Sequence, residues 1–197
     1  MRETQEKTRH VLVVRLPRAV EIRIEDVFLG LAGATKPTMG YHITVLGPFF
    51  LADGIDPRSL TPVSQVCARW RPFEVYISGL SAFQTKDDNT VYLRVQDCNR
   101  IVDLHYDLLR ATRGLINMQD ERILRWNEEQ YEPHVTLALN LVDKGLAEFM
   151  RAAATRDLQA SFTVDKIWLC LQEPNGPWQY TAQFPFGETG PEPSSDE

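Results

Sequence analysis

The chain contains the same short pattern twice: a histidine, an apolar residue, a threonine and a second apolar residue. The first copy is His42-Ile43-Thr44-Val45, and the second is His134-Val135-Thr136-Leu137. Successive side chains of a strand point to opposite faces, so each histidine shares a face with its threonine while the apolar pair points the other way. The pattern therefore predicts two half-buried strands, each of which presents an imidazole and a hydroxyl on one face.

These two strands occupy matching places in a repeated order of elements. Each half of the chain reads as strand, helix, histidine strand, helix and strand. The spacing of apolar residues predicts these elements at 10–17, 22–31, 42–46, 57–70 and 73–80, and again at 91–95, 99–113, 134–137, 143–156 and 162–171. The spacing of large apolar residues also recurs, in Phe73, Val75 and Leu80 and in Phe162, Val164 and Leu169.

Two copies are too few for a solenoid, so the repeat indicates two packed α+β lobes related by a pseudo-twofold axis. We expect one domain over residues 1–186, with interleaved lobes and repeat halves at about 10–83 and 90–172. A last strand is predicted over 178–184, with four apolar or aromatic residues on one face: Trp178, Tyr180, Ala182 and Phe184. We interpret this stripe as core, with a platform for stacking nucleobases as the alternative.

Charge argues against a general nucleic-acid binder. The formal net charge is −6, and the last eleven residues carry four acids and no base, which leaves −2 for the rest of the chain. Non-specific duplex binding draws its affinity from an excess of Lys and Arg, so any nucleic-acid chemistry here is expected to be local. Residues 187–197 lack a large apolar side chain, and we expect a disordered acidic tail.

The sequence also gives expectations about the compartment. It has no run of 18 apolar residues and begins with a polar segment, which predicts a cytoplasmic protein that does not contact a membrane. The three cysteines, Cys67, Cys98 and Cys170, stand far apart and are expected to be reduced thiols. We expect a monomer.

If the lobes are related by a pseudo-twofold axis, both histidine–threonine pairs face a common cleft. Residues two apart on a strand lie roughly 6.5–7 Å from each other, which lets an imidazole and a hydroxyl contact one phosphate group. One histidine can then accept a proton while the other donates one. Two such motifs among four histidines arise by chance on the order of one time in a hundred.

Other chemistries receive little support. Neither motif brings the further ligands that a zinc site needs, so no metal or cofactor is expected. Phosphate-binding glycine loops, dinucleotide-binding loops and the nucleophile elbow of serine hydrolases are missing. His10 and His105 have no threonine two residues on and are expected to be structural, and Asp87-Asp88 is expected to be a solvated turn.

The two motifs and their flanks, Tyr41-His42-Ile43-Thr44-Val45-Leu46-Gly47-Pro48-Phe49 and Glu132-Pro133-His134-Val135-Thr136-Leu137-Ala138, resemble a known pair of motifs. They are similar to the H-x-T motifs of the two-histidine phosphoesterase superfamily, whose LigT-like members are called 2′,5′ RNA ligases or cyclic nucleotide phosphodiesterases. The resemblance covers about residues 10–186. It implies a bilobal α+β fold with two antiparallel sheets, flanking helices and a central cleft.

The resemblance also implies a function. It makes His42 and His134 the acid and base, makes Thr44 and Thr136 the phosphate ligands, and suggests metal-independent hydrolysis of a 2′,3′-cyclic phosphate on a small nucleotide or an RNA terminus. Some relatives are described with the second histidine as base, which would assign that role to His134. The alternative is a module that binds a nucleotide or RNA end in the same cleft without turnover.

One further segment is left open by the sequence. Residues 115–132 have the length of a flap and contain four side chains that suit a phosphate or a base: Arg122, Arg125, Trp126 and Tyr131. A solvated loop with a small packed cluster explains the same residues.

Overall fold

The computed structural model describes residues 7–28, 34–56, 60–84 and 89–187. Its helices are α1 (Arg18–Glu25), the 3-10 helix η1 (Asp26–Phe28), α2 (Thr61–Arg69), α3 (Asn99–Ala111), α4 (Glu121–Glu129) and α5 (Asp143–Ala154). Its strands are β1 (Arg9–Arg15), β2 (His42–Leu51), β3 (Phe73–Gln84), β4 (Asn89–Gln96), β5 (Ile116–Asn117), β6 (His134–Leu141), β7 (Ala160–Val164), β8 (Lys166–Gln172) and β9 (Trp178–Pro185).

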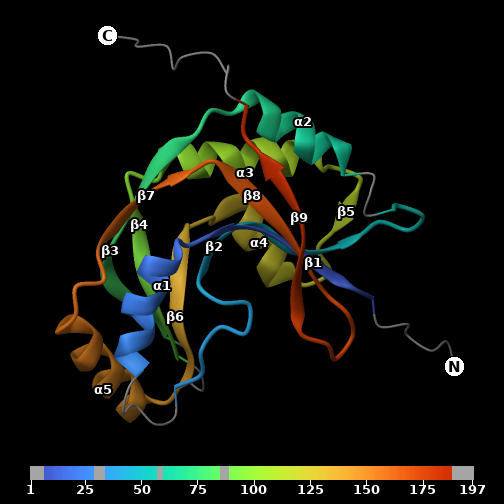
Figure 1. The fold of residues 1–197 in the computed structure, drawn as a ribbon. Helices are drawn as coiled ribbons and strands as arrows, with labels where there is room; N and C mark the ends of the chain where they lie inside the picture. The colour runs from blue at the N-terminus through green and yellow to red at the C-terminus, as the bar shows by residue number, and fades with distance from the viewer. Residues whose placement is uncertain (1–6, 29–33, 57–59, 85–88, 188–197) are drawn as a thin grey trace, which may run out of the picture.

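The strands form one curled antiparallel sheet in the order β7-β3-β4-β6-β2-β1-β8-β9, and β5 pairs separately with β2 (Figure 1). Between β2 and β6 only one residue pair is in register, Ile43 opposite Val135. This pair joins two four-stranded halves, which are the two predicted antiparallel sheets. Each half combines strands of both sequence repeats, because β3 pairs with β4 while β8 pairs with β1.

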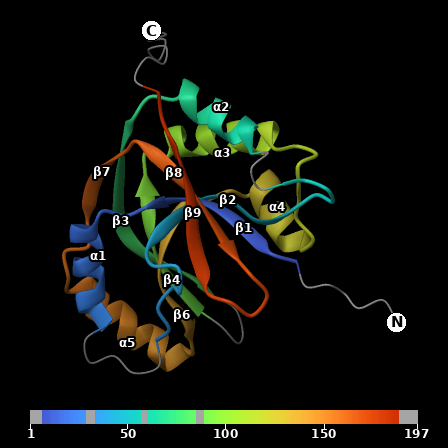
Figure 2. The same cartoon turned by 45° about the vertical axis from the view of Figure 1, so that its right-hand side comes forward.

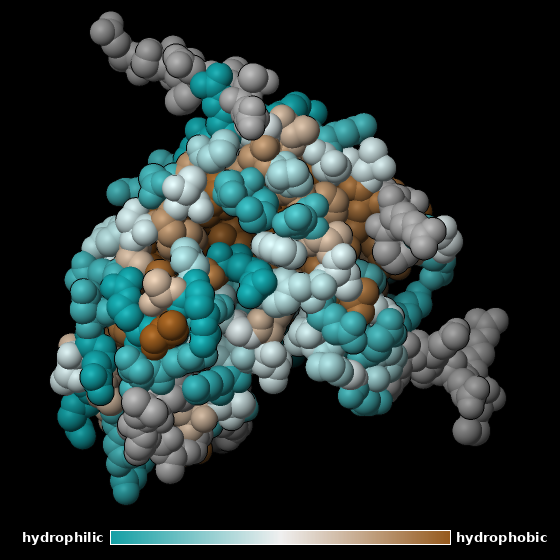
Figure 3. Space-filling model, viewed as in Figure 1, coloured by the Kyte–Doolittle hydropathy of each residue, from teal (hydrophilic) through white to brown (hydrophobic). Residues whose placement is uncertain are grey.

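Helices cover the outside of the sheet. Helices α2 and α3 lie side by side at one end of the molecule, and α1 and α5 lie at the other (Figures 1 and 2). The main core fills the space between sheet and helices, and its largest fully buried side chains include Phe49, Leu104 and Phe149. The space-filling view shows a notch in the lower edge of the molecule, between the region of α1 and α5 and the β8–β9 hairpin (Figure 3).

Several predicted boundaries need correction. The strand predicted over 162–171 is two strands, β7 and β8, which are separated at Asp165 and pair with different partners. The recurring apolar residues of the two repeats face each other there, with Phe73 opposite Val164. The helix predicted over 22–31 begins earlier, at Arg18, and continues as η1 to Phe28. Strand β2 also continues through Gly47-Pro48 instead of ending there.

The stripe predicted on β9 packs against apolar clusters as expected, but its four residues do not share one face of the sheet. The register between β8 and β9 shifts after Leu169, so that Ala182 opposes Leu169 while Tyr180 opposes Cys170. Thr181 is the extra residue of this bulge, and an extra residue reverses the faces of a strand beyond it. Ala182 and Phe184 consequently pack against the main core, whereas Trp178 and Tyr180 pack against a small separate cluster with Val11, Val13 and Cys170.

Two expectations lie outside the described residues. These are the disordered tail, apart from Gly187, and the Asp87-Asp88 turn. The first residues of the helix predicted over 57–70 also lie outside them, and the described part of that helix is α2.

Candidate active site

The two histidine motifs lie on neighbouring strands. Ile43 of β2 pairs with Val135 of β6 in antiparallel register, so that His42 is placed opposite Thr136 and His134 opposite Thr44. Burial alternates as predicted: the motif histidines and threonines are half-buried, and the apolar residues between them are buried. Opposed residues of an antiparallel pair share a face, so the four polar side chains gather on one face of the sheet.

Each motif imidazole is oriented by the same local hydrogen bond. Nδ1 of His42 donates to the carbonyl oxygen of Gly40 at 2.8 Å, and Nδ1 of His134 donates to the carbonyl oxygen of Glu132 at 2.7 Å. Both acceptors lie two residues before the histidine. Because Nδ1 is the donor, the neutral ring keeps its other nitrogen, Nε2, as the free acceptor. The site therefore holds two imidazoles of the same tautomer, each able to exchange a proton through Nε2.

Burial lowers the pKa of both histidines. For His42, the loss of solvation dominates; the bond to Gly40 opposes it, and the charge of His134 lowers the pKa further. For His134, the loss of solvation again dominates, and the carbonyl and carboxylate of Glu132 oppose it. Two imidazoles that feel each other's charge accept a first proton more readily than a second, so they titrate as a pair.

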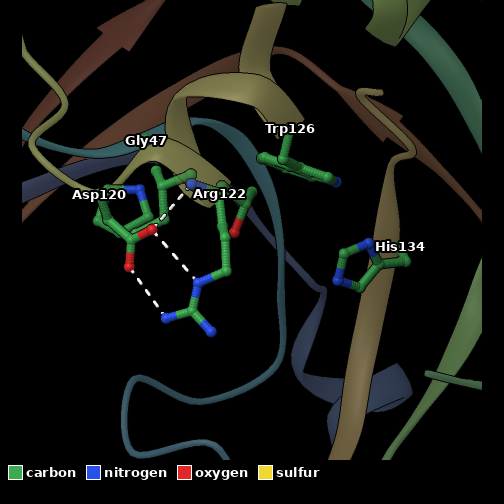
Figure 4. A pocket seen from close by; sticks show the side chains of 8 residues that line it. Gly47, Asp120, Arg122, Trp126 and His134 are labelled. Carbon is green, nitrogen blue, oxygen red and sulfur yellow. Dashed lines mark hydrogen bonds and ion pairs between the residues drawn. The ribbon is translucent and has the colours of Figure 1, made fainter. Parts of the chain in front are cut away.

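A cavity of about 460 Å³ opens beside the motifs. Its lining comes from β2, β6 and the segment around α4: Thr44, Gly47, Pro48, Asp120, Arg122, Ile123, Trp126 and His134. Figure 4 shows Trp126 and His134 on one side of the cavity, with Arg122 and Asp120 on the other. The volume is in the range of sites that bind small molecules.

Helix α4 supplies the cavity wall that the sequence left open. Asp120 caps the helix by accepting a hydrogen bond from the backbone N–H of Arg122 at 2.8 Å, and its carboxylate pairs with the Arg122 guanidinium at 3.2 Å. The Arg122 side chain and backbone hold the pKa of Asp120 below its ordinary value. Arg125 instead pairs with Glu129 and does not line the cavity. The capping residue and the spacing of Ile123 and Trp126 were the signals for this helix.

Aromatic rings surround His134. Its ring centroid lies 5.1 Å from those of Phe83 and Tyr92 and 6.1 Å from that of Trp126. No ring contact of His42 is found among the described residues. The two motifs are thus equivalent in their backbone and in the bond at Nδ1, but different in their surroundings.

A buried polar network fastens α4 to the strand of the first motif. Asn127 is fully buried; its Oδ1 accepts from the backbone N–H of Gly47 at 3.1 Å, and its Nδ2 donates to the carbonyl of Gly47 at 3.3 Å. The ring nitrogens of His105 lie 2.7 Å from the carbonyl oxygens of Val45 and Asn127. Tyr131 stacks on His105 at 3.8 Å and donates to the carbonyl of Thr44 at 2.9 Å.

Gly47 is suited to this network by its backbone. Its φ is +112°, and a Cβ there would lie 3.0 Å from the Phe49 ring and 3.1 Å from the carbonyl oxygen of His10. No side chain fits at this position without displacing the strand. The close contact between β2 and Asn127 therefore depends on glycine.

Of the four histidines, only His134 lines this cavity, and of the two motif threonines only Thr44 does; His42 and Thr136 lie on the same strands outside its lining. His10 and His105 also lie outside it, in keeping with the structural role predicted for them. His10 is buried and stacks on Phe49 at 5.8 Å, and His105 belongs to the network described above. In the described ranges, no group of three or more His, Cys, Asp or Glu side chains is placed to hold a metal ion. No helix in that part of the chain has the length and apolar character needed to cross a membrane.

Three comparisons relate the chain to known proteins. Residues 23–175, which include both motifs, match the model of the 2′-5′ RNA ligase superfamily. A Bacillus pumilus protein named "Putative phosphoesterase" is 26% identical over 153 residues, covering 76% of this chain and 81% of that protein.

Solved structures with a similar fold include TT0787 of Thermus thermophilus, with a TM-score of 0.63, 18% identity and coverage of 92% of this chain and 100% of that one. Escherichia coli LigT complexed with 3′-AMP gives a TM-score of 0.61 at 17% identity, covering 92% of this chain and 99% of that one. These likenesses establish a LigT-like fold. Because the family model spans most of the chain and both histidine motifs, the chain belongs to the 2′-5′ RNA ligase superfamily.

Proposed function

We propose that this phosphoesterase-family chain hydrolyses 2′,3′-cyclic phosphates on nucleotides or RNA ends, with His42 and His134 as an acid–base pair. The observation that carries the proposal is the matched orientation of the two imidazoles, each with Nδ1 tied to a carbonyl and Nε2 left for proton exchange. Proton transfer needs groups that titrate near neutral pH, which imidazole provides. A site that only binds phosphate has no such requirement.

The reaction needs two proton transfers around one phosphorus atom. One histidine takes a proton from water as the water oxygen bonds to phosphorus. The bond from phosphorus to one ribose oxygen breaks, and the other histidine gives that oxygen a proton. The hydroxyls of Thr44 and Thr136, set opposite the two histidines, donate hydrogen bonds to the non-bridging oxygens.

The cavity wall suits a nucleotide. Arg122 provides a cation that can face phosphate, and Trp126 offers an aromatic ring on which a base can stack. The E. coli LigT structure with 3′-AMP shows that a protein of this fold binds a nucleotide. We assign the ligand of this chain to the same class.

The test is to incubate the purified protein with 2′,3′-cyclic mononucleotides and with RNA that ends in a cyclic phosphate, and to identify the products by chromatography. The proposal expects a 2′- or 3′-monophosphate. A protein that binds these ligands and leaves them intact would be a binding module, and the enzymatic proposal would be wrong.

Hydrolysis is expected to persist after thorough chelation. The proposed mechanism takes its proton transfers from the two imidazoles and its phosphate contacts from hydroxyls and Arg122. Turnover measured after dialysis against EDTA should therefore match that of the untreated protein, within about twofold. Loss of turnover in EDTA, with recovery on adding one metal, would contradict the mechanism.

A substrate with a good leaving group separates the roles of the histidines. We assign His134 as the base toward water and His42 as the acid toward the leaving oxygen. In a nitrophenyl phosphodiester, the nitrophenolate leaves phosphorus without needing a proton. His42→Ala should therefore regain much of its lost activity on this substrate, while His134→Ala should not. Recovery of His134→Ala alone would reverse the assignment. Recovery of neither variant would mean that both histidines mainly bind phosphate.

A further inference from the structure

The face that carries His42 extends beyond the cavity onto strands β1 and β8. In the β1–β2 register, Arg15 lies opposite His42 and Val13 lies opposite Thr44. Val13 also lies opposite Trp168 of β8. Opposed residues of antiparallel strands share a face, so Arg15 and Trp168 stand on the face of the motif side chains.

The bulge in β9 brings two more aromatic rings to this face. Beyond the register shift, Tyr180 lies opposite Cys170 and Trp178 lies opposite Gln172. These positions follow Trp168 in alternation along β8. Figure 2 shows β1, β8 and β9 next to one another.

Two arginines lie against these rings. The Arg15 guanidinium is 4.5 Å from the ring centroid of Tyr180 and 5.5 Å from that of Trp168, and the Arg9 guanidinium is 5.7 Å from that of Trp178. Both arginines are exposed, and the rings are half-buried. We call these five residues, Arg9, Arg15, Trp168, Trp178 and Tyr180, the arginine–aromatic surface.

This surface is able to bind an anion. None of the ion pairs among the described residues involves Arg15. Stacking on an aromatic ring orients a guanidinium while leaving its N–H edge available for a phosphate. A hollow of about 260 Å³ adjoins it; Arg15 and Trp168 line it, together with Lys166 and Asp165, which pair with each other.

A purely structural role explains only part of this arrangement. The rings cover the small cluster of Val11, Val13 and Cys170, and that alone accounts for their half-burial. Covering this cluster does not explain why two exposed arginines lie on the same face of the sheet as the motif histidines. Since the body of the chain carries a formal net charge near zero, this local gathering of cations is a distinguishing feature.

We propose that the arginine–aromatic surface binds the RNA strand next to the reacting terminus, an inference that rests on the proposed function. Each further nucleotide brings one negative charge for an arginine and one base with a π-face for a ring. Trp168 is two strands from Thr44, about 10 Å away at the usual strand spacing, which the neighbouring nucleotide can span. The chain therefore prefers oligonucleotide ends to free cyclic mononucleotides.

The experiment compares kcat/KM for a 2′,3′-cyclic mononucleotide with that for a four-nucleotide RNA ending in the same cyclic nucleotide. The ratio of the RNA value to the mononucleotide value should exceed one in the parent protein. It should fall about tenfold in Arg15→Gln and in Trp168→Leu, since base stacking on a protein ring contributes about that much or more. Arg15→Lys keeps the charge and should give an intermediate ratio. Arg151→Gln, at an exposed arginine of α5, is the matched control and should leave the ratio unchanged.

Binding provides a second, independent measurement. The dissociation constant of the same RNA, labelled with a fluorophore, is measured on His134→Ala, which should not turn it over, with and without Arg15→Gln. Arg15→Gln should weaken binding and make the slope of log Kd against log salt shallower by about 0.7. The melting temperature of each variant is measured as well, to check that weaker binding does not come from unfolding.

These measurements separate the two proposals. Arg15→Gln could weaken RNA binding although the parent protein hydrolyses no cyclic phosphate. That result would support RNA binding by this surface and would overturn the proposed function. The opposite result is hydrolysis by the parent protein with no effect of Arg15→Gln. If Arg15→Gln and Arg151→Gln gave the same kcat/KM ratio and the same dissociation constant, the proposal that this surface binds RNA would be wrong.

Discussion

Replacing either His42 or His134 with alanine is expected to lower kcat on a cyclic phosphate by roughly 10²–10⁴-fold, the usual contribution of one positioned acid–base group. Each imidazole is half-buried on the sheet face and is held through Nδ1 by a backbone carbonyl. Removing the ring eliminates the proton-transfer group and leaves the buried apolar residues of the strand in place. Steady-state kinetics will show the loss, and circular dichroism should be nearly unchanged.

His10→Leu is the matched histidine control. His10 is buried and stacked on Phe49, away from the cavity lining, so this variant should retain its kcat at temperatures where it is folded. Thr44→Val and Thr136→Val remove only a hydroxyl and should reduce activity less than the histidine variants, by about tenfold. If His10→Leu lost as much activity as His42→Ala in a folded protein, the site would be wrongly placed.

Replacing Asn127 with leucine is expected to reduce kcat/KM by about 10- to 100-fold and to lower the melting temperature by roughly 5–10 °C. The Asn127 side chain bonds both backbone groups of Gly47 and so joins α4 to the first motif strand, and the backbone carbonyl of Asn127 lies 2.7 Å from the His105 ring. Leucine leaves the Gly47 N–H and carbonyl without these partners, at about 2–3 kcal/mol of unfolding free energy. A displaced α4 moves Arg122 and Trp126 away from the phosphate.

Asn89→Leu provides the control for stability. Asn89 is also buried, and its amide donates to the carbonyl of Leu141 at 2.8 Å, but it does not line the cavity. Both leucine variants should melt at lower temperature, whereas only Asn127→Leu should lose kcat/KM when assayed well below its melting point. Equal kcat/KM for the two variants would show that the network supports folding alone.

The parts of the site that the sequence predicts are those governed by local alternation. His-x-Thr between apolar residues on a strand fixes which side chains share a face, and the strands β2 and β6 have that pattern of burial. The repeated order of elements also predicts that the two motifs come together. These inferences need only the period of a strand and the symmetry of the repeat.

The cavity wall was harder to predict because its helix is rich in charged residues. Only Asn127 of α4 is buried, and it is a polar residue buried by its hydrogen bonds to β2. The cap at Asp120 and the spacing of Ile123 and Trp126 are weak signals for such a helix, since tertiary hydrogen bonds hold it in place. The arginine–aromatic surface was harder to predict for a different reason. The sequence offers the aromatic residues of β9 as a stacking platform only as an alternative to core, and no residue in the strand signals the bulge at Thr181 that separates Trp178 and Tyr180 from Ala182 and Phe184.

The measurement that tests the account most directly is the pH dependence of kcat/KM on a cyclic mononucleotide. The active form holds one proton on the histidine pair, so that one ring is the acid and the other is the base. Burial lowers the pKa of both histidines below the ordinary value of 6.5, and their mutual charge resists the second proton. The singly protonated pair is therefore most populated on the acid side of pH 6.5. We expect a bell-shaped profile with its maximum there, whereas a value of kcat/KM that rises steadily into the alkaline range would contradict catalysis by this pair.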